Sequence, residues 1–146
     1  MLDDYLEPDH LTPLQKQRER VLWRDEGKCQ LHALGFTDHS CSGRPQCAHI
    51  PPKQAIKRYR RDLALRERNG KTLSDAQRAL VRASEPEVVA DTRGALTMCE
   101  TGHSAFDLLG RRGLKVNLPD HVLEFVADYG LEPLLDRLFA QEAKAA

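Results

Sequence analysis

Three of the four cysteines lie close together in the sequence, among several histidines. Cys29, Cys41 and Cys47 fall within nineteen residues, whereas Cys99 stands in the second half of the chain. Three histidines stand in or beside this stretch: His32, His39 and His49. Thiolates and imidazoles are ligands that zinc prefers, and four cysteines in a reducing compartment are not expected to pair as disulfides. We therefore expect the cysteines to be metal ligands, with buried thiols as the alternative.

A second group of metal-binding side chains follows Cys99 in the stretch CETGHSAFD, residues 99–107. His103 and Asp107 are four residues apart, so on a helix they share one face and can hold one ion. Mixed imidazole and carboxylate ligation, completed by water, suits Mg²⁺ or Mn²⁺. Gly102 stands where a knuckle of two cysteines would have its second cysteine. The stretch therefore predicts a divalent-cation site beside half of a zinc site.

The elements that must position these residues are predicted to be mostly helical. Thr12, Pro13 and Gln15 give the start signals of a helix that runs to about residue 25 and stops at Gly27, just before Cys29. Residues 28–52 show no helical period and predict irregular structure with a small hairpin.

The remainder of the chain predicts several more helices. They are expected over residues 54–68, from 74 to about 83, over 117–130 and over 132–141. Residues 85–94 predict a loop or short strand, and residues 96–110 a turn that enters a short helix. The expected fold is therefore α+β and mostly helical: a small β-hairpin plus helix core with flanking helices, in a single domain over residues 1–146.

Composition and charge narrow the class of protein. No stretch approaches the apolar length that a membrane span needs, and the acidic N-terminus lacks the features of a signal peptide, so we expect a cytoplasmic protein. Net charge is zero, but residues 53–71 carry eight basic and two acidic side chains. Such a segment can present a local phosphate-binding face. Its candidate DNA contacts are Lys53, Lys57, Arg58, Arg60 and Arg61.

The order of these motifs resembles the HNH endonucleases, the ββα-metal nucleases of phages and bacteria. RDEGKC (24–29), CSGRPQCAHI (41–50) and CETGHSAFD (99–107) carry the resemblance, and AHIPPK (48–53) is similar to phage variants with Ala-His. The spread cysteine pair is similar to actinobacterial and phage versions. The resemblance covers about residues 18–112, with a basic helical insert near 54–90 and a C-terminal helical extension at about 117–141.

The resemblance implies a metal-dependent endonuclease that hydrolyses DNA phosphodiester bonds. His49 would be the general base, since imidazole titrates near neutral pH. Mg²⁺ or Mn²⁺ held by His103 and Asp107 would stabilise charge on the phosphate and the leaving oxygen.

The resemblance also implies a structural zinc ion with a cysteine-rich ligand set. Cys29, Cys41 and Cys99 are the ligands that it puts forward. The fourth ligand would be His32, with Cys47 as the alternative. Such an ion would staple a hairpin too small to fold alone. The implied partner is DNA, with phage packaging or recombination proteins as further partners; the sequence leaves the oligomeric state open.

Two positions depart from the family pattern. The middle Asn would fall near Gly94, where no Asn stands, and either Asp91 or Arg93 is a candidate replacement. Gly102 removes one expected zinc ligand. These departures favour a rival function, a zinc-stapled DNA-binding or scaffolding protein without nuclease activity. A third alternative is a small helical protein whose cysteines are incidental.

Overall fold

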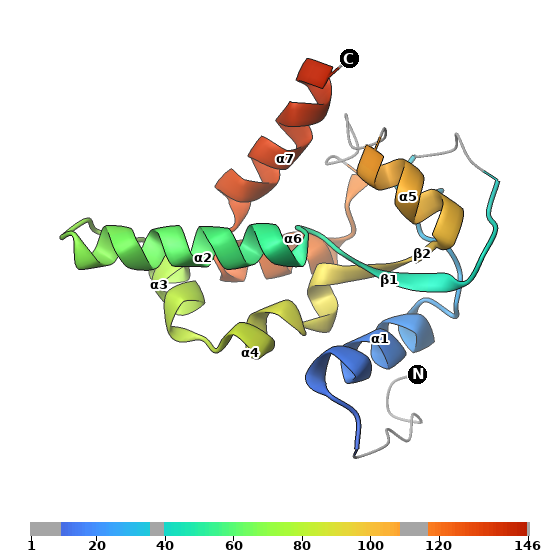
Figure 1. The fold of residues 1–146 in the computed structure, drawn as a ribbon, viewed down its shortest axis with the longest axis horizontal. Coiled ribbons are helices and arrows are strands. Elements are labelled where there is room, and N and C mark those ends of the chain that lie inside the picture. The colour runs from blue at the N-terminus through green and yellow to red at the C-terminus, as the bar shows by residue number, and fades with distance from the viewer. Residues whose placement is uncertain (1–9, 36–39, 109–116, 146) are drawn as a thin grey trace.

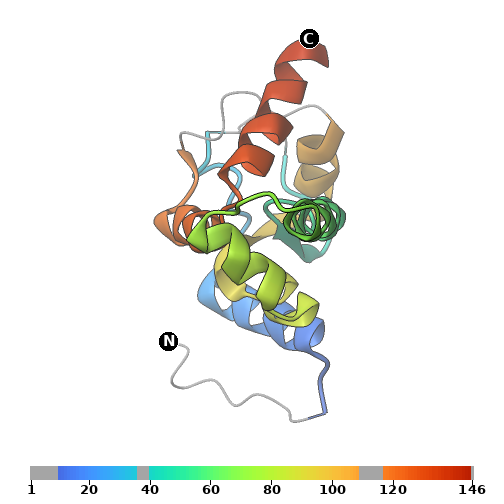
Figure 2. The same cartoon turned by 90° about the vertical axis from the view of Figure 1, so that its left-hand side faces the viewer.

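A computed structural model describes residues 10–35, 40–108 and 117–145. The predicted class is confirmed, because helices predominate and one antiparallel strand pair is present. α1 lies below this pair and α7 rises above it in both views (Figures 1 and 2). No helix in the described ranges is long and apolar enough to cross a membrane. In chain order the elements are α1 Pro13–Arg24, β1 Pro45–His49, α2 Lys53–Arg68, α3 Asp75–Arg82, α4 Glu85–Val89, the 3₁₀ helix η2 Thr92–Gly94, β2 Ala95–Cys99, α5 Glu100–Leu108, α6 Asp120–Asp128 and α7 Glu132–Ala145.

The start signals of α1 act as predicted. The Thr12 hydroxyl accepts a hydrogen bond from the Gln15 amide, and the Gln15 side chain accepts one from the Thr12 amide. This reciprocal pair satisfies backbone donors that a helix start otherwise leaves open. α1 packs against both strands, and its buried positions are Gln17 and Val21.

The two strands come from distant parts of the chain. β1 pairs with β2 in antiparallel register, so that Pro45 lies opposite Cys99 and His49 opposite Ala95. The expectation of a hairpin within residues 28–52 is therefore wrong, since only its last part forms a strand. All five residues of β2 are buried. A strand buried on both faces lacks the alternation of polar and apolar residues that marks a half-buried strand. For this reason the sequence predicts a turn where β2 forms.

Three helices and η2 separate the strands. α2 buries Ile56, Tyr59 and Leu63 against the core. The expected loop or strand at residues 85–94 is wrong, because α4 forms there. The Ser84 hydroxyl accepts a hydrogen bond from the Glu87 amide, and a proline stands in the first turn. Both features favour a helix start.

The C-terminal helices close the core from the other side. Phe125 of α6 is fully buried and meets Tyr129 edge to face, with ring centroids 5.5 Å apart. α7 packs on α2 and α6 through Leu134, Leu135 and Phe139. The C-terminal helices thus pack on the same core as the strand pair.

Candidate functional site

Three cysteines meet at the start of α5. The Sγ atoms of Cys29, Cys41 and Cys99 all lie within 4.8 Å of one another, so the group could hold a metal ion. Thiolates bound to one tetrahedral zinc ion at the usual bond length stand about 3.8 Å apart. The group is compatible with that spacing without large rearrangement. Cys99 is buried and Cys41 is exposed, so a bound ion would lie at the protein surface.

The RD pair at the end of α1 holds Cys29 near β2. The Arg24 guanidinium donates to the Thr92 and Ala95 carbonyls at 2.8 and 2.7 Å and to the Asp25 carboxylate. Asp25 in turn accepts a hydrogen bond from the Thr97 amide at 2.9 Å. Burial alone would raise the pKa of Asp25, but these hydrogen bonds hold it below its usual value. This network fixes the chain that leads into the cysteine group.

Gly102, which stands where the motif pattern would have a second cysteine, still contributes to the cysteine group. The Gly102 amide donates to the Cys99 Sγ at 3.1 Å, which favours the thiolate form that binds a metal. His32 lies beside the same group, with its Nε2 3.5 Å from the Cys41 Sγ. Cys47 is elsewhere, in the middle of β1 opposite Thr97. Burial raises the pKa of the Cys47 thiol to about 11, so it is a neutral thiol at pH 7.

His49 ends β1 and is half-buried. Its Nε2 lies 2.7 Å from the Oε1 of Gln17 on α1. Burial, with smaller electrostatic effects from Lys53 and His103, lowers the pKa of His49 to about 4. The ring is therefore neutral at pH 7 and can accept a proton. The effect of His103 also means that the two imidazoles are near enough to interact electrostatically.

His103 lies on α5 and faces the first half of β1. Its Nδ1 is 2.8 Å from the Oε1 of Gln46, so Nδ1 carries the proton and the lone pair of the ring is on Nε2. Metal-binding histidines in proteins commonly donate their other ring N–H in this way. Asp107 lies one turn further along α5, but its side chain lies outside the described residues.

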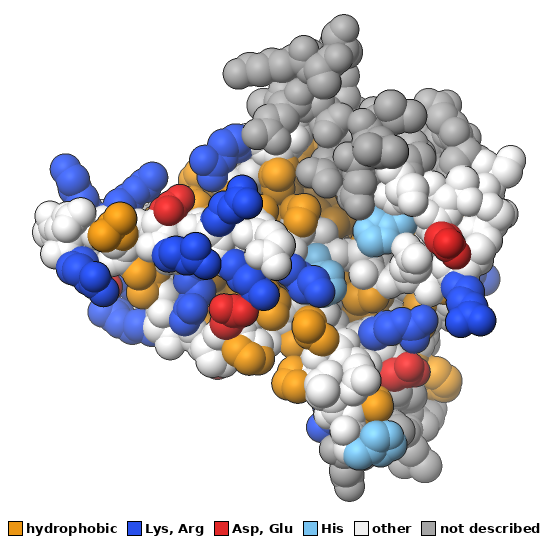
Figure 3. All heavy atoms as spheres, viewed as in Figure 1, with side chains coloured by type: hydrophobic (Ala, Val, Ile, Leu, Met, Phe, Trp, Pro, Cys, Tyr) orange, Lys and Arg blue, Asp and Glu red, His pale blue; other side chains and the backbone are white. Residues whose placement is uncertain are grey.

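A cleft of about 410 Å³ opens beside His49. Its walls come from α1, β1, the start of α2 and the start of α5. Three cations line it, Arg18, Arg44 and Lys53, against one carboxylate, Glu100. Figure 3 shows Lys and Arg side chains gathered along α2, with others over the region of α1 and β1. The cleft can therefore attract an anion to the face that carries His49.

The basic run on α2 divides into two kinds of residue. Arg60 donates to the carbonyls of Leu80, Val81 and Ala83 and so caps the C-terminus of α3. Lys57 pairs with Glu85 at 3.2 Å. Arg58 and Arg61 are exposed. Of the five predicted DNA contacts, Arg60 is thus engaged in holding α3, whereas Lys53 lines the cleft.

The position of the missing Asn has no room for a side chain. A Cβ on Gly94 would fall 2.6 Å from a ring carbon of Phe125. The loop is tied by Asp91 instead, whose carboxylate accepts from the Arg93 amide at 2.9 Å and from its guanidinium. Arg93 also bonds Asp128 on α6 at 2.6 Å. Both candidate replacements, Asp91 and Arg93, therefore hold this loop.

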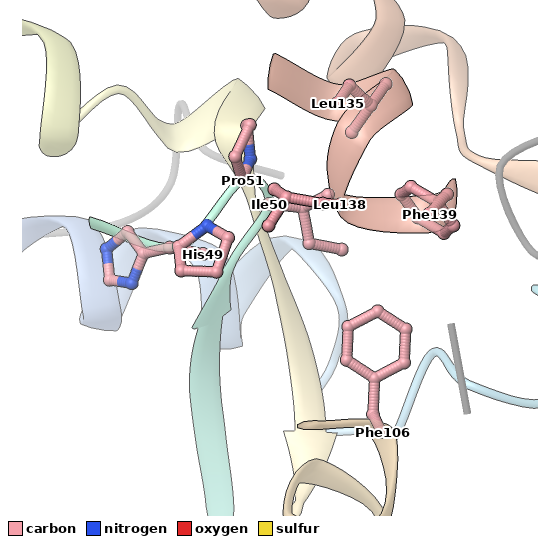
Figure 4. Close-up of a pocket in the computed structure, with 8 residues that line it drawn as sticks. His49, Ile50, Pro51, Phe106, Leu135, Leu138 and Phe139 are labelled. Atoms are coloured by element: carbon pink, nitrogen blue, oxygen red, sulfur yellow. The ribbon is translucent and has the colours of Figure 1, made fainter. Parts of the chain in front are cut away.

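The end of β1 at His49 packs against α7. Figure 4 shows His49 next to Ile50 and Pro51, with Phe106 and Phe139 away from its ring. The space between them is a cavity of about 10 Å³, room for about one water molecule. It is a small gap in the packing between the end of β1 and α7 rather than a ligand site.

Comparison with known proteins finds no matching family model, no matching curated protein and no matching solved structure. The residues of the site must therefore be interpreted from their own geometry. Two of them, Gln17 and Gln46, were not expected from the sequence. The available signal for Gln17 was its spacing, because a glutamine stands three and four residues from Leu14 and Val21 on the apolar face of α1.

Proposed function

We propose that this protein is a metal-dependent endonuclease that hydrolyses DNA phosphodiester bonds, in the manner of the HNH enzymes that its motifs resemble. The observation that carries the proposal is the position of His49. It is a neutral imidazole on the wall of a cation-lined cleft, and His103 is among the groups that lower its pKa. A base, a metal-binding imidazole and an anion-attracting surface are the parts that phosphodiester hydrolysis needs.

His49 would act as the general base. Its Nδ1 would take a proton from a water molecule whose oxygen attacks phosphorus, and the bond from phosphorus to the 3′ oxygen would break. A pKa of about 4 keeps the acceptor form at pH 7 but makes a weak base. A phosphate bound in the cleft would favour the imidazolium and so raise the basicity of His49 as the substrate arrives.

His103 and Asp107 would hold the divalent cation. When bound, Mg²⁺ or Mn²⁺ would supply Lewis-acid stabilisation of the phosphate and of the departing oxygen. The hydrogen bond from His103 to Gln46 supports this role, because it directs the lone pair of Nε2 away from the strand.

The substrate would be held by its backbone phosphates. Arg18, Arg44 and Lys53 would contact the phosphates nearest His49, and Lys57, Arg58 and Arg61 would extend the track along α2. Contacts of this kind orient a duplex without reading its sequence. Glu100 stands in the same cleft, where its charge would be neutralised by these cations or by the metal ion.

The cysteine group would hold zinc as a structural ion. Cys29, Cys41 and Cys99 supply three thiolates, and His32 is the fourth ligand that we propose, since its Nε2 is already beside Cys41. This ion would join the end of α1, the segment before β1 and the start of α5. The joint would fix the distance between His49 and His103, which stand on different elements.

Nicking of supercoiled plasmid tests the proposal. The purified protein should convert supercoiled plasmid to relaxed or linear forms with Mg²⁺, Mn²⁺ or Ni²⁺ and not with EDTA. His103→Ala should be inactive at low metal and partly restored by more Mn²⁺, because Asp107 remains as a ligand. Cys47→Ala is the matched control in the same strand and should cut as the wild type does. Binding without cutting in every metal would favour the zinc-stapled binding protein instead.

A further inference from the structure

We propose that Gln17 is the residue that positions His49 for catalysis, by fixing which ring nitrogen carries the proton. This inference rests on the proposed function only for its catalytic consequence. The tautomer itself is a property of the free protein. A base acts through one nitrogen, so a ring that populates both tautomers presents the correct acceptor for only part of the time.

The orientation of the Gln17 amide is determined by its surroundings. Its Nε2 donates to the carbonyls of Val89 and Asp91, both at 2.9 Å. Backbone carbonyls can only accept, so the NH₂ group must face them and the Oε1 must face His49. The reverse orientation would place one oxygen against two others. The Gln17 oxygen is therefore an acceptor aimed at the His49 ring.

This orientation fixes the His49 tautomer. Because Gln17 Oε1 only accepts, the His49 Nε2 at 2.7 Å must donate, and a neutral ring then has its lone pair on Nδ1. No hydrogen bond to Nδ1 is found among the described residues. The Gln17 contact thus occupies Nε2 and leaves the lone pair of the neutral ring on Nδ1.

Gln17 occupies a position on α1 where an apolar residue is the usual choice. It lies on the inner face of α1 with Val21, and its exposed fraction is 1%. A buried amide has a desolvation cost unless its donors and acceptor are all satisfied, and here all three are. Two of these bonds tie α1 to the loop around Asp91, and the third reaches only His49.

The tautomer can be read directly by ¹⁵N NMR. Long-range ¹⁵N–¹H spectra separate protonated from bare ring nitrogens, and the His49 signals are assigned by their absence from His49→Ala. In the wild type at about pH 7.5, without DNA, His49 should be almost wholly the Nε2–H tautomer. In Gln17→Leu the two tautomers should mix. Predominance of the Nδ1–H form in the wild type would overturn the inference, whether or not the protein cuts DNA.

A stability control separates positioning from packing. Thr12→Ala removes the N-cap of the same helix but no hydrogen bond to His49, so it should lower thermal stability and leave the His49 tautomer unchanged. Gln17→Leu should bind a DNA duplex as the wild type does but cut it about 10²-fold more slowly in a single turnover. Gln17→Met provides a second packing-competent variant if Leu does not fold. An unmixed tautomer together with a wild-type rate in either folded variant would refute the role of Gln17.

Discussion

Replacing His49 with Gln should make the protein less sensitive to acid. The environment of His49 disfavours its charged form, so the ring stays neutral in the folded protein at pH values where the unfolded chain has already bound a proton. The unfolded state then binds more protons than the folded one, and stability falls as the pH falls. The loss begins near pH 6.5 and continues until the folded ring also protonates, near pH 4.

The size of this effect follows from the two pKa values. Between about pH 7.5 and about pH 5, a histidine whose pKa falls from 6.5 to about 4 on folding lowers the free energy of unfolding by about 2 kcal/mol. Other groups titrate in the same range, but they do so in the variant as well. The difference between the wild type and His49→Gln therefore isolates the contribution of one ring.

Urea unfolding of zinc-loaded protein at both pH values measures it. The stability of the wild type should fall by about 2 kcal/mol more than that of His49→Gln over this interval. His10→Gln, which changes an exposed histidine that is not among the residues lining the cleft, is the control for histidine content. Equal losses in the wild type and His49→Gln would mean that the ring is not held neutral, and the description of His49 as a buried base would be wrong.

Three further changes test other parts of the site. Gly94→Asn, which introduces the residue that the HNH resemblance implies near this position, should lower stability by about 1–3 kcal/mol because its Cβ would meet the Phe125 ring, and thermal melting at or above the wild-type temperature would contradict this. Elemental analysis should find about one zinc per chain in the wild type and none in Cys99→Ser, and this variant should unfold at a lower temperature than the wild type. Zinc retained in Cys99→Ser would exclude Cys99 as a ligand. Reversing the charges of Arg58 and Arg61 should reduce the salt dependence of DNA binding by about one unit of slope per lost phosphate contact, whereas an unchanged slope would remove α2 from the interface.

Most of the helices, though not α4, could be predicted because their signals are local. Thr12 and Ser74 each accept a hydrogen bond from the amide three residues on, and the glutamines at those positions complete capping boxes. Such signals need only four residues of sequence, and so they survive without any knowledge of the fold. The grouping of Cys29, Cys41 and Cys99 was predicted from the family resemblance and agrees with their positions.

The rest could not be predicted because it depends on contacts between distant segments. β2 is buried on both faces, and 45 residues separate the end of β1 at His49 from the start of β2 at Ala95, so neither periodicity nor spacing indicates the pairing. Gln17 binds groups 32 to 74 residues away. The basic run predicts a DNA contact for Arg60, and only the position of α3 gives this residue a structural role.

The most direct test of the proposed function is single-turnover cleavage by His49→Ala. The variant should bind DNA and zinc as the wild type does but cut about 10²–10⁴-fold more slowly, since a general base acts only in the chemical step. Binding affinity, zinc content and cleavage rate are measured on the same preparation. A variant that cuts as fast as the wild type, or a wild type that cuts with no divalent metal, would contradict the account.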